Sequence, residues 1–396
     1  MSRRAIAAKV AADMQSASWV REMFERGRRL KAQLGEENVF DFSLGNPNAV
    51  PPPEFFDALR AVACEQRPEL HGYMSNAGFE ETRAAVARFV SREYGLELDG
   101  AAVVMTVGAA GGLNVALRAI CDPGDEIIVL APYFPEYRFY IEQAGARMVV
   151  VQTDAQFQPD IAAIQAALSA HTRGLIVNSP NNPSGAVYAE SCCRELAAVL
   201  QRHDRPDRPL YVLLDDPYRR LVYEGAPPAS LASCYPRSVL ISSFSKDVSL
   251  AGERIGYIAV PAGVPDRQLL LGAMTILNRT LGFVNAPALM QRVIARCVGA
   301  ACDFSFYRRN RDLLCRVLRH AGYELIVPGG SMFVFPRTPI DDDVAFVQRL
   351  LEQRILTVPG TGFGRPGHMR VSFAVAPHVI ERAAPGFQAA FRAAAR

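Results

Sequence analysis

The amino-acid sequence predicts an α/β fold, in which a mainly parallel, mixed sheet is sandwiched by helices and followed by a smaller α+β domain. Short apolar strands alternate with helical segments between about residues 80 and 260, as in a parallel sheet covered on both faces. From about residue 291 the pattern changes to long helices and short strands. A chain of 396 residues is also long enough to bury the cores of two domains.

The first segments predict a helix and an arm. Apolar residues recur at helical spacing and predict a helix over residues 4–33. Residues 41–48, Asp-Phe-Ser-Leu-Gly-Asn-Pro-Asn, predict a short strand and a turn. Prolines at 51–53 mark the start of a helix over about 54–64. We expect residues 1–60 to form a helix and arm that join the smaller domain.

Alternating segments then predict a large domain over residues 61–290 and the small domain over 291–396. Apolar runs predict strands at 103–106, 126–130, 148–151, 174–178, 210–214, 239–242 and 255–260, and later at 331–336 and 369–374. Helices are expected at 80–94, 111–120, 136–144, 190–203, 288–302 and 303–321. Ligands of such sheets bind beyond the carboxyl ends of the strands, so chemistry is expected from polar residues directly after strands.

Composition and charge argue against several classes of protein. A formal net charge of +3, with both signs spread along the chain, does not favour nucleic acid as a partner. The apolar run 101–120 is interrupted by glycines and polar residues, so it predicts a strand, a turn and a helix and not a membrane span. The eight cysteines form no C-x-x-C pair, and no histidine lies at metal-ligand spacing from them. We therefore expect free thiols, no metal site and a cytoplasmic protein.

Lysine is rare in this chain, which draws attention to Lys246. Only three of the 43 basic residues are lysines, and Lys246 directly follows a predicted strand in Ser-Phe-Ser-Lys. Nucleotide bias in the gene accounts for the arginines but not for a lysine retained at this position. A buried lysine amine can form an imine with an aldehyde cofactor. The hydroxyl of Ser243 and the guanidinium of Arg254 could then hold a phosphate.

A glycine-rich turn follows another predicted strand and opens a helix. It covers residues 106–112, Thr-Val-Gly-Ala-Ala-Gly-Gly. Free backbone amides and the positive end of a helix suit a phosphate dianion, and glycines let the main chain approach it closely. Glycines in strand-turn-helix connections also serve packing alone, and this alternative stays open.

Polar residues follow two more strands of the predicted sheet. Asp215 ends a very apolar strand, where a poorly solvated carboxylate needs a cationic partner such as a pyridinium nitrogen. Tyr218 could interact with a ring phenolate. The alternative is that Asp215-Asp216-Pro217 starts a helix, which suits Asp216 better than Asp215. Residues 178–185, Asn-Ser-Pro-Asn-Asn-Pro-Ser-Gly, predict a turn on the same side of the sheet.

In this order, the motifs resemble the class I/II aminotransferases of pyridoxal phosphate (PLP) fold type I, over nearly the whole chain. The resemblance implies that Lys246 forms the Schiff base with PLP and that Asp215 and Tyr218 act beside it as catalytic residues. Asp215 would bind the pyridine nitrogen, and Tyr218 the ring oxygen. The remaining cofactor-binding residues that it implies are Ser243 and Arg254 for the phosphate, the turn Gly108, Ala109 and Ala110, Asn182 for the ring oxygen, and Phe134 for stacking on the ring.

The same resemblance implies how substrate and partner subunit are bound. Arg370, in Met-Arg-Val-Ser-Phe, matches the arginine that clamps the α-carboxylate of an amino acid. Gly45 matches the small residue near that carboxylate, and Asn182 lies on the substrate side as well. Tyr73 looks like the tyrosine that reaches a phosphate in the neighbouring subunit, so a homodimer with shared active sites is implied. Phe333 stands where the family often has tyrosine, which leaves side-chain preference open.

The expected function is therefore PLP-dependent transamination between an L-amino acid and a 2-oxo acid. An alternative on the same fold is elimination, replacement, decarboxylation or oxidation, because all of these share the same cofactor chemistry. Ser243-x-x-Lys246 also matches the S-x-x-K of penicillin-binding enzymes, but the S-D-N and K-T-G motifs of that group are missing. A PLP-fold transcription regulator is not favoured, because the segment before Phe42 is too short for a DNA-reading domain with its linker.

Overall fold

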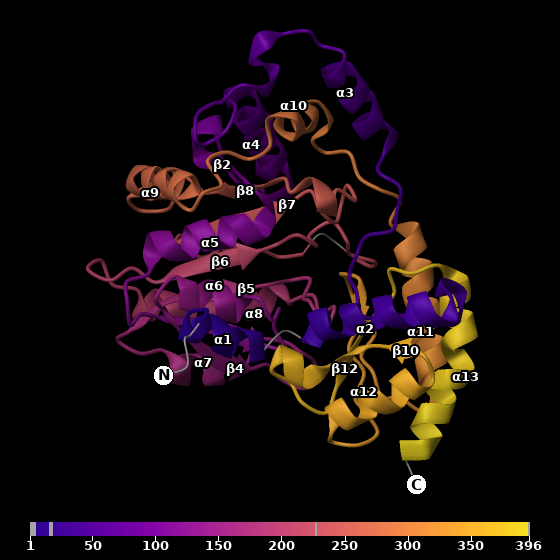
Figure 1. Cartoon of the computed structure of the whole chain (residues 1–396). Coiled ribbons are helices and arrows are strands. Elements are labelled where there is room, and N and C mark those ends of the chain that lie inside the picture. The colour runs from indigo at the N-terminus through magenta and orange to yellow at the C-terminus, as the bar shows by residue number, and fades with distance from the viewer. Residues whose placement is uncertain (1–4, 16–18, 226–227, 395–396) are drawn as a thin grey trace.

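The computed structural model describes residues 5–15, 19–225 and 228–394 (Figure 1). Its main sheet has the strand order β2-β8-β7-β6-β5-β3-β4, and β8 is antiparallel to both of its neighbours while the other pairs are parallel. The mainly parallel, mixed sheet that the sequence predicts is thus confirmed. Its strands are β2 (Val103–Thr106), β3 (Glu126–Ala131), β4 (Arg147–Gln152), β5 (Thr172–Val177), β6 (Tyr211–Asp215), β7 (Ser238–Ser243) and β8 (Gly256–Ala259).

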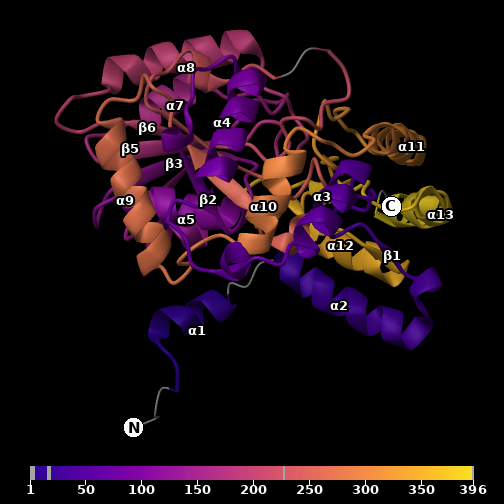
Figure 2. The same cartoon turned by 90° about the horizontal axis from the view of Figure 1, so that it is seen from above.

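Helices cover both faces of this sheet (Figure 2), because its strands are apolar on both sides. In β3, Ile127 and Val129 point into one core, and Ile128 and Leu130 point into the other. The first core is shared with α5 (Gly108–Ile120), α6 (Tyr137–Gln143) and α9 (Arg267–Thr280). The second is shared with α3 (Pro53–Ala63), α4 (Glu80–Tyr94), α7 (Ile161–Ala167), α8 (Glu190–His203) and α10 (Ala288–Cys297).

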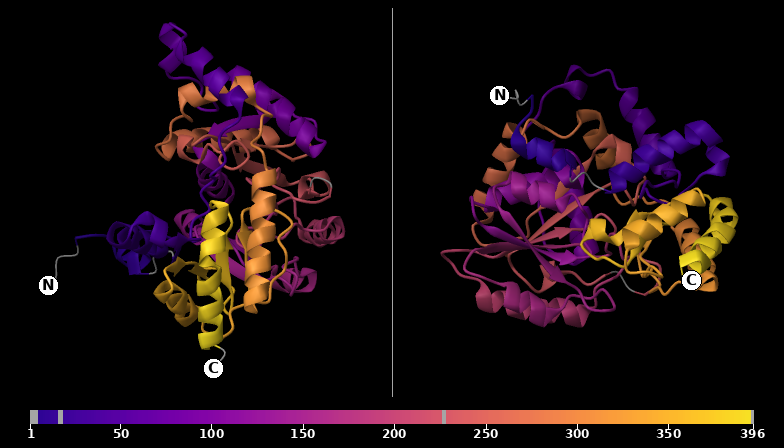
Figure 3. Two further views of the ribbon diagram at one scale, coloured as in Figure 1. Left: turned by 90° about the vertical axis from the view of Figure 1, so that its right-hand side faces the viewer. Right: turned by 60° about the horizontal axis from the view of Figure 1, so that its bottom comes forward.

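A third core lies beside the main sheet, where the C-terminal elements gather (Figure 3). A small antiparallel sheet has the order β11 (Val358–Pro359), β12 (Met369–Ser372) and β9 (Phe333–Val334). Strand β1 (Phe40–Asp41) pairs in parallel with β10 (Ile355–Leu356), so the N-terminal arm is tied to the C-terminal elements. The helices here are α2 (Trp19–Leu34), α11 (Ser305–Ala321), α12 (Asp343–Glu352) and α13 (Pro377–Ala394). The domain division at residues 60 and 290 stays a prediction.

Three elements differ locally from those predicted, and the last two differences have a physical cause. Residues 4–33 contain two helices, α1 (Ala8–Gln15) and α2, while residues 4 and 16–18 lie outside the described residues. Helix α5 begins at Gly108, three residues before the predicted start, because the glycine-rich turn is itself the first turn of the helix. Helix α10 ends at Cys297 and not at 302, since Gly299 has a positive φ of 100° that a continuing helix excludes.

Within the described residues, no helix combines the length and the apolar character that crossing a membrane requires. The cytoplasmic location stays a prediction.

Candidate active site

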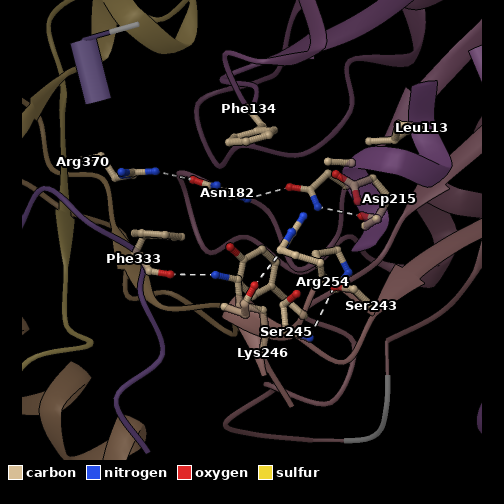
Figure 4. A pocket seen from close by; sticks show the side chains of 17 residues that line it. Leu113, Phe134, Asn182, Asp215, Ser243, Ser245, Lys246, Arg254, Phe333 and Arg370 are labelled. Atoms are coloured by element: carbon tan, nitrogen blue, oxygen red, sulfur yellow. Dashed lines mark hydrogen bonds between the residues drawn. The ribbon is translucent and has the colours of Figure 1, made fainter. Parts of the chain in front are cut away.

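One pocket collects most of the residues that the sequence singles out (Figure 4). It lies beyond the carboxyl ends of β5, β6 and β7, at the N-terminus of α5, and reaches across to β12. This is the edge where a parallel sheet places its ligands. The predicted residues that line it are Gly45, Ala109, Ala110, Phe134, Asn182, Asp215, Tyr218, Ser243, Lys246, Arg254 and Arg370.

Lys246 lies in the turn after β7, and its amine points into the pocket. The Nζ atom donates a hydrogen bond to the Gly45 carbonyl at 2.7 Å. Burial of the amine, helped by the positive charges of Arg370 and Arg254, lowers the pKa of Lys246 to about 8. A neutral amine, able to act as a nucleophile or a base, is therefore accessible near neutral pH.

The N-terminus of α5 and Arg254 form a cradle for an anion. The first backbone amides of a helix have no partner within the helix, and the helix dipole adds positive charge there. Arg254 has left-handed backbone angles (φ 53°, ψ 48°), and its Nη1 donates to the Ala251 carbonyl at 2.8 Å. Its guanidinium lies so close to Gly108 that a Cβ atom there would be 2.7 Å from Nη2. Only glycine, with its own positive φ of 69°, fits this contact.

This cradle fits a phosphate. Among the described residues no carboxylate forms an ion pair with Arg254, although its guanidinium faces the positive end of a helix. Two positive groups that lie side by side at the edge of a pocket are stabilised by a bound anion. The buried hydroxyl of Ser243 lines the same pocket and can donate to that anion.

Asp215 lies at the end of β6 and is buried. Burial, together with the charge of the neighbouring Asp216, raises the pKa of its carboxyl to about 7, although the Tyr137 hydroxyl opposes this shift by donating a hydrogen bond to Oδ2. A carboxylate in such surroundings is stabilised by a cation, so a protonated ring nitrogen fits here. The predicted alternative of a helix start is wrong. The chain turns after Asp216, whose carboxylate points away and accepts a hydrogen bond from the Tyr94 hydroxyl at 2.7 Å.

Asn178 braces two parts of the site that are distant in sequence. Its Nδ2 donates to the Asp215 carbonyl at 2.7 Å, and its Oδ1 accepts the backbone amide of Asn182 at 2.7 Å. Asn178 is itself buried, so both hydrogen bonds are protected from water. The side chain therefore fixes the turn that carries Asn182 relative to the strand end that carries Asp215.

Arg370 enters the pocket from β12, on the side of the C-terminal elements. Nη1 donates to Asn182 Oδ1 at 3.0 Å and Nη2 to the Ser43 carbonyl at 2.6 Å, as Figure 4 shows for the first. The guanidinium stacks on the rings of Phe333 and Phe363, at 4.3 and 4.9 Å from their centroids. Burial lowers the pKa of Arg370 to about 10, so it stays cationic near neutral pH. No carboxylate of the described residues pairs with it, so this buried cation fits a substrate carboxylate.

Gly45 makes room for this arrangement. A Cβ atom at this position would lie 2.2 Å from the Phe333 ring, so any larger residue would displace the ring that packs under Arg370. The ring of Phe333 also meets Tyr218 edge-on, at 6.3 Å between centroids. Phe333 thus lines the pocket beside Arg370.

Two predicted residues do not line the pocket, and some lining residues were not predicted. Gly108 lies beneath Arg254, where it shapes the cradle, and the side chain of Tyr73 is 94% exposed. Tyr137 was missed because only the fold brings its hydroxyl to Asp215, from a helix 78 positions earlier. Leu113 and Ser245 also line the pocket, and each lies within a few residues of a predicted motif.

Replacing Tyr137 with phenylalanine is expected to raise the pKa of Asp215, because the hydrogen bond that lowers it is lost. The measurement is the affinity of the cofactor-free protein for the cofactor as a function of pH. Its midpoint should lie about one pH unit higher in the variant than in the wild type, because one hydrogen bond to a charged group is worth about 1.5–3 kcal/mol. Tyr140→Phe on the same helix is the matched control. Its hydroxyl is no hydrogen-bond partner of Asp215 in the described part of the chain. An unshifted midpoint in Tyr137→Phe would contradict this role.

A lysine with a lowered pKa, an anion cradle and a carboxylate suited to a cationic ring converge in one pocket of an α/β fold. Together they define the class of enzyme that binds PLP through a lysine. The model of the family "Aminotransferase class I and II" matches residues 37–386. The chain belongs to this family: it is a PLP-dependent aminotransferase, as predicted from the sequence.

Individual relatives agree with this assignment. The chain is 32% identical to the probable aspartate/prephenate aminotransferase of Thermus aquaticus, over 92% of this chain and 94% of the relative. It is 31% identical to the aspartate/prephenate aminotransferase of Thermus thermophilus, over 98% and 97% of the two chains. The crystal structure of an aminotransferase from Eubacterium rectale superposes with a TM-score of 0.94 at 38% identity, covering 99% of this chain and 100% of that one. None of these likenesses favours elimination, hydrolysis or gene regulation.

Proposed function

We propose that this pocket transfers the α-amino group of an L-amino acid to a 2-oxo acid, with Lys246 as the residue that binds the cofactor and moves the proton. The observation that supports this most directly is the amine of Lys246, whose pKa is lowered to about 8 in the same pocket as Asp215 and Arg370. When bound, PLP supplies an aldehyde that condenses with amines and a ring that delocalises negative charge.

The cofactor would be held at both of its ends. Its phosphate would be bound by the backbone amides of the turn 108–110, the Ser243 hydroxyl and the Arg254 guanidinium. Asp215 would hold the ring nitrogen in its protonated form, and Phe134 would stack on the ring. The ring oxygen would be bound by Asn182 and Tyr218, which line the pocket on the other side.

Substrate binding would depend on Arg370, with Gly45 leaving room for the carboxylate. The guanidinium can form two parallel hydrogen bonds to an α-carboxylate, which orients the Cα–H bond relative to the cofactor ring. The neutral Nζ of Lys246 would accept the Cα proton and later return it. Since only the deprotonated amine acts as a base, its active fraction rises as the pH passes upward through about 8.

Arg370→Leu is expected to raise KM for an amino-acid donor about 100-fold, because two charge-assisted hydrogen bonds to the carboxylate are lost. The half-reaction of purified holoenzyme, followed by the absorbance of the cofactor, measures this. The preference for an L-amino acid over the corresponding amine without a carboxylate should fall by a similar factor. Arg382→Leu is the matched control, as Arg382 is exposed on α13 and stacks on Phe40 outside the pocket. An undiminished preference in Arg370→Leu would refute the assignment.

We also propose that the enzyme works as a homodimer in which Tyr73 of one subunit reaches the phosphate in the other. Tyr73 does not line the pocket of its own chain, and its side chain is almost fully exposed. A tyrosine hydroxyl can donate a hydrogen bond to a phosphate oxygen. An exposed aromatic residue of this kind is typical of a subunit interface.

A further inference from the structure

The loop of residues 74–79, which follows Tyr73, is fixed by side-chain amides, two of which are completely buried, although it carries no residue of its own pocket. Three amides converge on it from α9, α10 and the connection between these helices. They belong to Asn278 in the last turn of α9, Asn285 in the connection and Gln291 in the first turn of α10.

Asn278 joins this loop to the main sheet. It is completely buried, and its Nδ2 donates both to the Asn76 carbonyl at 2.9 Å and to the Met105 carbonyl at 3.2 Å. The backbone amide of Met105, in β2, donates to the Ala77 carbonyl at 2.8 Å. The loop is thus held against β2, the strand that leads into the phosphate turn.

Asn285 and Gln291 fix the loop on either side of this contact. Asn285 Nδ2 donates to the Ser75 carbonyl at 2.8 Å, and Gln291 Oε1 accepts the backbone amide of Phe79 at 2.9 Å. Gly78 has a positive φ of 104°, and a Cβ atom there would lie 2.6 Å from Gln291 Oε1. The loop therefore fits the amide of Gln291 only with glycine at this position.

Burying a polar amide is unfavourable unless the amide is hydrogen-bonded, and the hydrogen bonds of Asn278 and Gln291 are made to this loop and its surroundings. Here they order the loop that directly follows Tyr73, whose side chain projects into solvent and not into its own pocket. A hydroxyl that must meet a phosphate oxygen across an interface has to be held to within about 0.5 Å, which needs a rigid base. A rigid base next to an exposed tyrosine suits a tyrosine that acts on another molecule.

We propose that Asn278, with Asn285 and Gln291, is a positioning residue for the active site of the partner subunit. It holds the loop 74–79 so that Tyr73 binds the cofactor phosphate of a second copy of this chain. This inference rests on the proposed homodimer. In it, Asn278 acts in trans: it improves phosphate binding in the partner's site and not in the site of its own chain.

Heterodimers with a single intact site test this assignment. Two differently tagged chains are co-expressed, and one carries Lys246→Ala so that only the other chain has a working lysine. Asn278→Leu is then placed either on the chain with Lys246 or on the chain with Lys246→Ala. Affinity of the intact site is measured by titration with pyridoxal 5′-phosphate and, separately, with pyridoxal, which lacks the phosphate.

We expect Asn278→Leu to weaken binding of pyridoxal phosphate about 10-fold when it lies on the Lys246→Ala chain, since one hydrogen bond to the phosphate is then lost. On the chain with Lys246 it should leave this affinity within about two-fold. Affinity for pyridoxal should be alike in the two arrangements. An equal loss in both arrangements, or a loss only when the change lies on the chain with Lys246, would overturn the trans role of Asn278.

Tyr73→Phe in the same two arrangements separates the two proposals. If it weakens phosphate binding in trans and Asn278→Leu does not, the positioning role fails and the shared site stands. If Tyr73→Phe has no trans effect, the shared site itself fails. Asn310→Leu is the matched control for stability, because Asn310 is also buried and donates to two backbone carbonyls, of Phe373 and Val375. A trans effect of Asn310→Leu would show that loss of stability alone explains the result, and would also overturn the inference.

Discussion

Lys246→Ala is expected to lower kcat about 10⁴-fold, the largest effect of any single substitution in the pocket. The change would remove both the amine that we propose as the cofactor's partner and the base that we propose for the Cα proton, and general base catalysis alone is worth about 10²–10⁴-fold. Steady-state transamination and the single half-reaction measure the loss separately.

The two other lysines of the chain provide controls. Lys9 is exposed on α1, where it pairs with Glu142, and Lys31 pairs with Asp41 at 2.8 Å. Both lie outside the pocket. Lys9→Ala and Lys31→Ala should retain turnover within about two-fold, in the range of surface substitutions. Full activity in Lys246→Ala would contradict the assignment outright.

The lowered pKa of Lys246 also sets a direction for the effect of pH. Burial shifts this pKa down to about 8, so the neutral fraction of the amine grows as the pH rises through that value. The rate at which cofactor-free protein captures PLP should therefore increase with pH, reach half of its maximum at about pH 8 and level off above that pH.

Asp215→Asn is expected to reduce kcat about 10³-fold and to weaken cofactor binding. An amide cannot supply the negative charge that keeps a ring nitrogen protonated, and loss of one preorganised electrostatic partner costs about 10²–10³-fold in other enzymes. The half-reaction and a titration with the cofactor measure the two effects. The loss of kcat and the weaker cofactor binding should both be present at pH 8. The pKa of the wild-type carboxyl is about 7 in the free protein, so this carboxyl is mostly ionised at that pH.

Asp216→Asn is the matched control for this change. Asp216 is the next residue and is also buried, but it faces Tyr94 and Arg219 on the other side of the turn. An asparagine there can still accept the hydrogen bond of the Tyr94 hydroxyl. We expect it to alter stability and to retain most of the activity. Equal losses in the two variants would mean that Asp215 supports the fold and has no special part in the reaction.

The sheet and the residues at its strand ends were predictable because local rules govern them. Apolar runs form the strands, and Asp215 and Lys246 directly follow two of these strands. Arg370 and Gly45 carry no such signal. They lie far from the other site residues in sequence, and only the resemblance to a family connected them with the pocket.

Contacts between distant side chains could not be predicted in this way. The hydroxyl of Tyr137 meets Asp215, and Asn178 links Asp215 to the turn of Asn182, because folding brings separate strand ends together. The start of α5 at Gly108 was also missed. Glycine disfavours the interior of a helix, but here the first glycine is required by the guanidinium of Arg254 packed against it.

The most direct test of the account is to locate the covalent bond to the cofactor. Purified holoenzyme is reduced with borohydride and digested, and its peptides are identified by mass spectrometry. We expect a single pyridoxyl group, on the peptide that contains Lys246, and none on the peptides of Lys9 and Lys31. A pyridoxyl group on either of those lysines, or on no peptide at all, would contradict the central claim that Lys246 binds the cofactor.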